Sequence, residues 1–305
     1  MKKLFKVRWT SWASAASLLT LALPMVSAQT VDTLARIKAN NKLVIAYSKT
    51  SSPFSFELEG RPLGYSIDIC LKVADAIKSR LKAPALKVEL LAIPFTDRLE
   101  AVKAGTVDIE CSNVTQTRER RALYNFSLPH FLTTVKTMVR SDSGIDKIED
   151  MRGKTMTYST GSVSERAVRE LNAQQLYNMK ALILKTTPES LAALSDRRAD
   201  GFVYDEVALV SMRASSARPK DFKLLEKVHF MNPLALVLPK GDTEFKTVVD
   251  KELSRIMLDG EGLSLYRKWF QSPIPPQNIN MDMPLYYLMR EHMRWPLDVY
   301  VEDVK

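Results

Sequence analysis

The chain has few of the residues that build metal centres. Only two cysteines and three histidines occur among its 305 residues, and no Cys-x-x-Cys pair is present. His130, His229 and His292 are scattered and lack the spacing of metal ligands. We therefore expect no structural zinc and no cofactor. Cys70 and Cys111 leave two alternatives open, a disulfide in an exported protein or a Cys70 that packs on a helix face.

Long apolar runs are also scarce, and the single candidate lies near the N-terminus. Residues 12–23 are apolar but shorter than the roughly 20 residues that span a bilayer. Four basic residues precede this run, and Val26-Ser27-Ala28 follows it before Gln29. This order is typical of a secretory signal peptide over residues 1–28, with an uncleaved anchor as the alternative. We expect an exported, soluble mature protein.

The excess of positive charge does not indicate nucleic-acid binding. Removing the four basic residues of the signal peptide lowers the formal net charge from +9 to +5. The densest basic run, residues 118–121, has no aromatic residues interleaved for base stacking. We expect no nucleic-acid partner.

Two segments share a layout of helix, turn and short strand. Apolar positions three residues apart lead into strand-like runs at 107–111 and 201–204. Polar clusters follow each run, at 115–120 and at 204–206. Because ligands bind at the carboxyl ends of strands in open α/β sheets, we expect two lobes that face one cleft. Chance similarity between two α/β units is the alternative.

The remaining pattern predicts how the lobes connect. Residues 124–140 have a β-rich second half, and 234–239 form a matching apolar run, which predicts two strands that cross between the lobes as a hinge. We predict an α/β fold with lobe 1 at 29–135 and 236–305 and lobe 2 at 136–235. Within lobe 1 we expect a helix at 32–40, a strand at 42–47, a polar loop at 48–56 and a helix from Gly64.

Ordered motifs across nearly the whole mature chain carry a family resemblance. They are Pro53-Phe54-Ser55 and residues 64–68, 105–111, 115–120, 126–127, 160–162, 200–205 and 268–276. With these motifs the chain resembles the type-3 periplasmic solute-binding proteins, the amino-acid receptors of ABC importers. The final motif, Trp269-Phe270 followed by Pro273-Ile274-Pro275-Pro276, resembles the glutamate/aspartate-binding branch.

The resemblance implies a site for the α-groups of an amino acid. Arg120 would hold the α-carboxylate, because a guanidinium fork matches two carboxylate oxygens. Thr115 would contact the same carboxylate or the amine, and Asn113 would lie beside it. Asp205 would pair with the α-ammonium. The alternatives are a solvated Arg120 within a charged run and an Asp205 that serves as a turn or helix-cap carboxylate.

Two helix starts in lobe 2 could either contact the ligand or serve only as helix caps. Ser162 precedes a helical run whose N-terminal amides favour an anion, while Ser164 is a candidate N-cap of that helix. Thr187 matches a position that reaches the ligand in the family, but it also precedes Pro188 as an N-cap would. Phe54, Phe56 and Tyr204 could cover the ligand or belong to the core.

Selectivity for the ligand side chain is where the chain departs from the family pattern. Of two arginines expected around an acidic side chain, one matches Arg98 and the other falls on Ser48. Lys49 is next to Ser48 but points to the opposite side of a strand end. A further family serine falls on Phe95. A neutral or differently charged amino acid therefore remains an alternative ligand.

Taken with the resemblance, these residues predict a monomeric periplasmic receptor that closes on an amino acid and delivers it to an inner-membrane ABC permease. A secreted cyclohexadienyl-type dehydratase on the same fold is the enzyme alternative, with Asp205 or Glu206 as general acid. Against this alternative, the sequence shows no nucleophile–base pair, metal set or phosphate loop. We also expect no sensor module, because no signalling domain follows residue 305.

Overall fold

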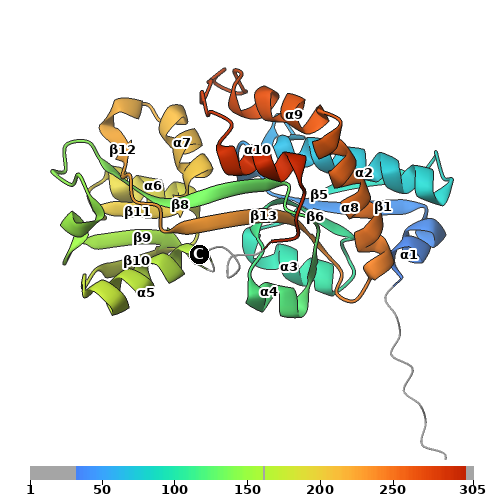
Figure 1. Cartoon of the computed structure of the whole chain (residues 1–305), viewed down its shortest axis with the longest axis horizontal. Coiled ribbons are helices and arrows are strands. Elements are labelled where there is room, and N and C mark those ends of the chain that lie inside the picture. The colour runs from blue at the N-terminus through green and yellow to red at the C-terminus, as the bar shows by residue number, and fades with distance from the viewer. Residues whose placement is uncertain (1–31, 161, 300–305) are drawn as a thin grey trace, which may run out of the picture. The chain divides into compact units, whose positions relative to one another are not determined.

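The computed structural model describes residues 32–160 and 162–299 and is drawn in Figure 1. The predicted signal peptide lies outside these described residues. Within the described part of the chain, no helix has both the length and the apolar character needed to cross a membrane. Nor does this part hold a group of three or more His, Cys, Asp or Glu side chains that could bind a metal ion.

A 10-stranded mixed sheet runs through the described residues (Figure 1). Its main order is β10 (Lys180–Leu184), β9 (Thr155–Ser159), β11 (Gly201–Asp205), β8 (Phe131–Arg140), β13 (Phe230–Leu238), β6 (Ile109–Thr115), β1 (Lys42–Tyr47) and β5 (Lys87–Ala92). Off this path, β12 (Phe222–Leu224) pairs with β8, and β7 (Asn125–Phe126) pairs with β13.

The predicted two-lobed α/β fold is confirmed, with β8 and β13 as the crossing strands. Strands β9, β10 and β11 form a parallel set in one lobe, and β1, β5 and β6 form one in the other. Between the two sets, β8 and β13 pair antiparallel with each other. The predicted boundaries at 135/136 and 235/236 fall inside these strands, and the exact residues that divide the lobes stay a prediction. The first lobe means the elements around β1, β5 and β6, and the second lobe means those around β9, β10 and β11.

Helices flank both sets of strands. In the first lobe they are α1 (Thr33–Asn40), α2 (Tyr65–Leu81), α3 (Phe95–Lys103), α4 (Arg118–Leu123), α8 (Thr243–Leu258), α9 (Glu261–Phe270) and α10 (Tyr287–Arg294). In the second they are α5 (Ser164–Gln175), α6 (Thr187–Ser195) and α7 (Glu206–Ser215), with short 3-10 turns η1 (Ile148–Met151) and η2 (Pro219–Asp221).

The loop predicted at 48–56 was only partly correct. It contains β2 (Thr50–Ser51) and most of β3 (Ser55–Leu58), which form a small antiparallel sheet with β4 (Arg61–Leu63). Helix α2 begins at Tyr65 as expected. Its cap residue, Gly64, has φ +136°, and a Cβ there would lie 2.1 Å from the Phe54 carbonyl oxygen, so this position requires glycine.

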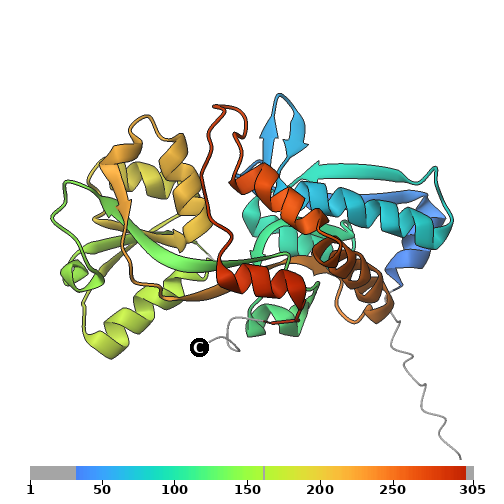
Figure 2. The same cartoon turned by 45° about the horizontal axis from the view of Figure 1, so that its top comes forward.

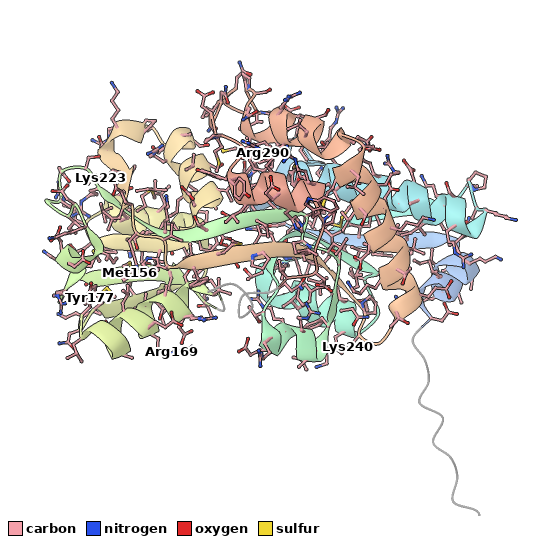
Figure 3. The ribbon with its side chains drawn as sticks, viewed as in Figure 1. Met156, Arg169, Tyr177, Lys223, Lys240 and Arg290 are labelled. Carbon is pink, nitrogen blue, oxygen red and sulfur yellow. A yellow bond between two sulfur atoms is a disulfide. The ribbon has the colours of Figure 1, made fainter. Side chains whose placement is uncertain are left out.

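Each lobe has its own apolar core. In the first lobe, Ile69, Val73 and Ile77 of α2 are fully buried, as their spacing along one helix face predicts. Phe54 packs edge-to-face on Phe131, so the core alternative for this residue is the correct one. The second lobe has a separate core that includes Met156 and Tyr177, both labelled in Figure 3.

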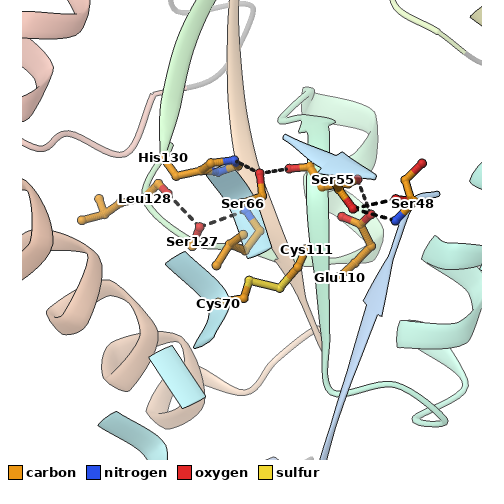
Figure 4. The surroundings of a disulfide bond; sticks show 11 residues. Ser48, Ser55, Ser66, Cys70, Glu110, Cys111, Ser127, Leu128 and His130 are labelled. Atoms are coloured by element: carbon orange, nitrogen blue, oxygen red, sulfur yellow. Dashed lines mark hydrogen bonds between the residues drawn. A yellow bond between two sulfur atoms is a disulfide. The ribbon is translucent and has the colours of Figure 1, made fainter. Parts of the chain in front are cut away.

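A disulfide joins Cys70 on α2 to Cys111 on β6, with their Cα atoms 6.4 Å apart. This settles the alternative that the sequence left open. Figure 4 shows the bond beside Glu110, the residue before Cys111 on β6. The cross-link therefore ties the core helix of the first lobe to the strand that carries Asn113 and Thr115.

The C-terminal segment returns to the crossing strands. Beyond α9 the chain turns back and reaches α10 (Figure 2). The Leu132 amide of β8 donates to Met289 Sδ at 3.3 Å, and His292 Nε2 lies 2.7 Å from the Pro129 carbonyl oxygen. The hydroxyl of Tyr286 also reaches Glu206 Oε1 of the second lobe at 3.4 Å. The segment thus contacts β8 and the start of α7.

Candidate functional site

The two polar clusters lie where the sequence pattern predicted them. Strand β6 ends at Thr115 and β11 ends at Asp205. Both strands run parallel to their neighbours on one side, so these residues lie at carboxyl ends, where α/β sheets bind ligands. The sheet thus presents one polar cluster from each lobe.

Arg120 is held against the end of β6. Its Nη1 donates to the Thr115 carbonyl at 3.0 Å, and its backbone amide donates to Thr117 Oγ1 at 3.3 Å, which caps α4. Burial lowers the pKa of the Arg120 guanidinium, while Tyr204, Glu110 and Asp205 nearby oppose that effect. Arg120 is therefore a partly desolvated cation close to groups from both lobes.

Asp205 is buried and caps no amide. It occupies the N-cap position of α7, but its side chain makes no capping hydrogen bond. Its Oδ1 accepts from Asn232 Nδ2 on β13. Burial raises the pKa of Asp205 to about 7, and Asn232 and Arg120 reduce the shift. The helix-cap alternative thus does not account for this carboxylate.

Tyr204 connects the two clusters. It precedes Asp205 on β11, and burial first and Asp205 second raise its pKa. Arg98, a hydrogen bond with Asn113, and Arg120 act in the opposite direction. One aromatic residue of the second lobe therefore lies next to three of the predicted site residues of the first.

A small pocket of about 60 Å³ continues from Tyr204. Its lining comprises Ser51 of the first lobe and Ser159, Ser162, Lys185, Thr186, Thr187 and Tyr204 of the second. The buried hydroxyls of Ser159 and Ser162 make no hydrogen bond to the described residues. Buried hydroxyls are normally hydrogen-bonded, so these two are available to a polar ligand.

Two capping predictions for this lobe were wrong. Thr186, not Thr187, is the N-cap of α6, and its hydroxyl accepts from the Glu189 amide at 3.3 Å. The Glu189 side chain closes a capping box back to Thr186, a pairing that needs a spacing of three residues and therefore excludes Thr187. Ser164 is the first residue of α5, and Val163 stands at its N-cap position. Thr187 and Ser164 are thus not N-caps.

Arg98 is fully buried on α3 and forms an ion pair with Glu110. Its Nε lies 3.0 Å from Glu110 Oε1, which also accepts from the Ser112 hydroxyl. Burial raises the pKa of Glu110, and Arg98, Ser112 and Arg120 oppose the rise. The arginine predicted for an acidic ligand side chain therefore already has a carboxylate partner.

Ser48 lies in the short turn between β1 and β2, where its hydroxyl is hydrogen-bonded by neighbouring residues. Its hydroxyl accepts from Ser51 Oγ at 2.8 Å and from the Thr50 amide at 3.3 Å. Lys49 points elsewhere, as expected, and pairs with Glu57 at 2.9 Å. Ser51 links this turn to the small pocket, so Ser48 borders the candidate site without supplying charge. Phe95 is the first residue of α3, and the structure does not describe its side chain.

Sequence reasoning missed three residues of this region. Glu110 was noted only as part of a family motif, and Asn232 lay just before the predicted crossing run 234–239. Lys185 stood before a helix start and had no distinguishing spacing. The available signal for Glu110 was its position inside a strand-like run, between the apolar residues Ile109 and Cys111.

Known proteins match this arrangement over most of the chain. Residues 43–272 match the bacterial extracellular solute-binding proteins, family 3. The L-glutamate/L-aspartate-binding protein of Pseudomonas aeruginosa is 31% identical over 286 residues, which cover 93% of this chain and 95% of the relative. The glutamate/aspartate import solute-binding protein of Escherichia coli is 29% identical over 292 residues, covering 93% and 97%.

A solved structure agrees with these matches. The ancestral amino acid-binding protein AncCDT-1, described as a precursor of cyclohexadienyl dehydratase, superposes with a TM-score of 0.67 at 25% identity. The match covers 78% of this chain and 99% of the ancestral one. All three are named as binding proteins, which agrees with the expectation of a non-enzyme. The chain belongs to family 3 of the bacterial extracellular solute-binding proteins, the amino-acid-binding periplasmic components of ABC importers.

Proposed function

We propose that this protein binds glutamate or aspartate between its lobes and delivers it to an ABC-type import permease as a monomer. The observation that carries the proposal is that Arg120 of α4 is held against the end of β6 while Asp205 ends β11 of the other lobe. These two groups complement the carboxylate and the ammonium of one zwitterion. Relatives about 30% identical over nearly the whole chain are named for glutamate and aspartate.

The α-groups bind as follows. Arg120 offers its guanidinium to the α-carboxylate, with Thr115 and Asn113 beside it at the end of β6. The α-ammonium lies against the Asp205 carboxylate and relieves its burial. The unsatisfied hydroxyls of Ser159 and Ser162 donate to ligand oxygens, and Thr187 adds a third hydroxyl at the same pocket.

The ligand's side-chain carboxylate is bound by cations from both lobes. Arg98 lies on the first lobe. Lys185 of the second lobe lines the pocket together with Ser51, the residue whose hydroxyl bonds Ser48. Lys185 thus supplies positive charge near the turn where the family arginine is absent.

Binding favours the closed arrangement of the lobes. A ligand that contacts Arg120 and Asp205 at once stabilises the state in which both are near, and β8 and β13 are the strands that bend. The permease then recognises the closed receptor. No step in this cycle changes a covalent bond of the ligand.

A thermal-shift screen of the purified protein against the natural amino acids, followed by calorimetry, tests the proposal. A ligand at 100 times its dissociation constant stabilises the folded state by about 2.7 kcal/mol. We expect glutamate or aspartate to give the largest shift and Arg120→Ala to abolish it. Arg121→Ala is the matched control, because Arg121 pairs with Asp298 instead. A response to neutral amino acids alone would overturn the acidic ligand, and no response to any would overturn amino-acid binding.

A further inference from the structure

Glu110 is a buried carboxylate that the proposed binding mode leaves unused. Its side chain is fully buried on β6, and one oxygen is shared by Arg98 and the Ser112 hydroxyl. The other oxygen, Oε2, makes no hydrogen bond to any residue that the structure describes. Figure 4 shows Glu110 next to Cys111 on β6, with its side chain directed toward Ser48 and Ser55.

Apart from Lys185, which is solvent-exposed, the charges of the site sum to zero before a ligand enters. Arg98 and Arg120 contribute two positive charges, and Glu110 and Asp205 contribute two negative ones. A neutral amino acid keeps this balance. Glutamate or aspartate brings one further negative charge into a region where Arg98 and Glu110 are both nearly inaccessible to water.

Two carboxylates would then contact one guanidinium. When like charges share a buried site, one carboxylate becomes much harder to ionise. Glu110 is the group that responds, because the Arg98 guanidinium that it contacts is the one it would share with the ligand, whereas the ligand α-carboxylate and Asp205 would have Arg120 and the α-ammonium as partners. Its pKa is already raised by burial, with Arg98 as the main opposing influence, and a ligand carboxylate that shares Arg98 weakens that opposition.

The other charged groups near β6 are paired with partners other than Glu110, apart from the two arginines that face it. On β3, Glu57 bonds Lys49 and Tyr47 at 2.9 Å and 2.5 Å. On β1, Lys42 pairs with Glu89, and on α2, Asp68 pairs with Lys268. On the α3 and α4 side, Arg98 and Arg120 face Glu110.

The neutral and weakly coupled groups complete these surroundings. His130 is buried beside Ser66, and burial lowers its pKa to about 3, so it stays neutral. Lys185 lines the pocket but is solvent-exposed, so water and salt screen its charge.

We propose that Glu110 takes up one proton from solvent when an acidic amino acid binds, so that the ligand enters as a charge-neutral pair with that proton. The inference rests on the proposed acidic ligand. In the free protein Glu110 is the ionised partner of Arg98. In the complex it is a neutral acid, and the ligand's side-chain carboxylate takes its place as the counter-ion. Neutral amino acids bind without this proton.

Calorimetry at pH 8 in two buffers of different ionisation enthalpy measures the proton directly. Asp205, with a pKa of about 7, is mostly ionised at pH 8 and releases little. We expect uptake of about one proton with glutamate and none with glutamine. Between pH 8 and 9 the dissociation constant for glutamate should rise about tenfold, whereas that for glutamine should rise only by the small factor with which the free α-ammonium begins to lose its proton.

Glu110→Gln provides the second arm, and Glu57→Gln is its matched control at a nearby solvated carboxylate. We expect Glu110→Gln to bind glutamate with no proton uptake and with the same weak pH dependence as glutamine shows between pH 8 and 9, and Glu57→Gln to behave like the native protein. Glutamate binding without proton uptake in the native protein would overturn this inference alone. Binding of neutral amino acids only would overturn the acidic ligand as well. If Glu110→Gln does not fold, proton uptake by the native protein with glutamate and with glutamine still tests the inference.

Discussion

Asp205→Asn is expected to stabilise the free protein while it weakens ligand binding. The native carboxylate is buried with one neutral hydrogen-bond donor, Asn232, and its pKa of about 7 lies well above the ordinary value of 3.8. The folded state therefore holds this proton more tightly than the unfolded state does. Between about pH 4 and 7, the free energy of unfolding falls as the pH rises, because the folded state must bury the charge.

The size of the effect follows from the shift. From pH 5 to pH 8 the native protein loses about 2.7 kcal/mol of unfolding free energy through Asp205. The loss falls between pH 5 and the pKa of about 7 in the folded state, a range of about two pH units at about 1.36 kcal/mol for each unit. An amide at this position has no charge to bury, so the variant lacks this loss. Removing the partner of a buried ammonium costs about 3–5 kcal/mol, which weakens ligand binding by roughly a hundred- to several-thousand-fold.

Urea unfolding at pH 5 and pH 8 measures the first effect, and calorimetry with glutamate measures the second. Asp196→Asn is the control, because the Asp196 side chain is 64% exposed on the same lobe. We expect the native protein and Asp196→Asn to lose stability equally between the two pH values and Asp205→Asn to lose about 2.7 kcal/mol less. The same pH dependence in all three proteins would refute a buried, proton-holding Asp205.

Three further predictions concern the frame and the selectivity of the site. Replacing Cys70 and Cys111 by serine should lower the free energy of unfolding by about 4 kcal/mol in denaturant titrations, from the 41-residue separation that the bond closes; an unchanged midpoint would contradict this. Gly64→Ala should destabilise by more than about 2 kcal/mol, since its Cβ meets the Phe54 carbonyl oxygen at 2.1 Å, and a Tm within a degree of the native value would refute it. Lys185→Met should weaken glutamate more than glutamine in calorimetry, and equal losses would argue against its charge role.

The spacing of apolar residues predicted the main helices and strands well, because each element buries one regularly spaced apolar face. The spacing of Ile69, Val73 and Ile77 predicts α2, and all three are buried. The two helix–turn–strand units placed Thr115 and Asp205 at strand ends. Each prediction depends only on local pattern and on the general rule that ligands bind at carboxyl ends.

Features that depend on contacts between distant segments could not be predicted in this way. Glu110 and Arg98 are adjacent only because α3 packs on β6, and Asn232 reaches Asp205 only because β13 crosses between the lobes. The N-cap of α6 is a local feature, but Thr186 and Thr187 are identical in chemistry. Only the reciprocal bond from Glu189 distinguishes them.

Asp205 and Arg120 together explain why closure would depend on the ligand. In the absence of an ammonium, the closed arrangement buries Asp205 with the Asn232 amide as its hydrogen-bond partner, and burial raises the pKa of Asp205 to about 7, so the buried charge is unfavourable above that pH. Opening the lobes returns the carboxylate to water and removes the penalty. A zwitterion removes the same penalty without opening, because it supplies the missing cation to Asp205 and a carboxylate to Arg120. On the proposed function, the cost of burying the Asp205 carboxylate makes the closed state unfavourable without a ligand. Because the ligand removes this cost only in the closed state, it binds that state more tightly than the open one, as ligand-driven closure requires.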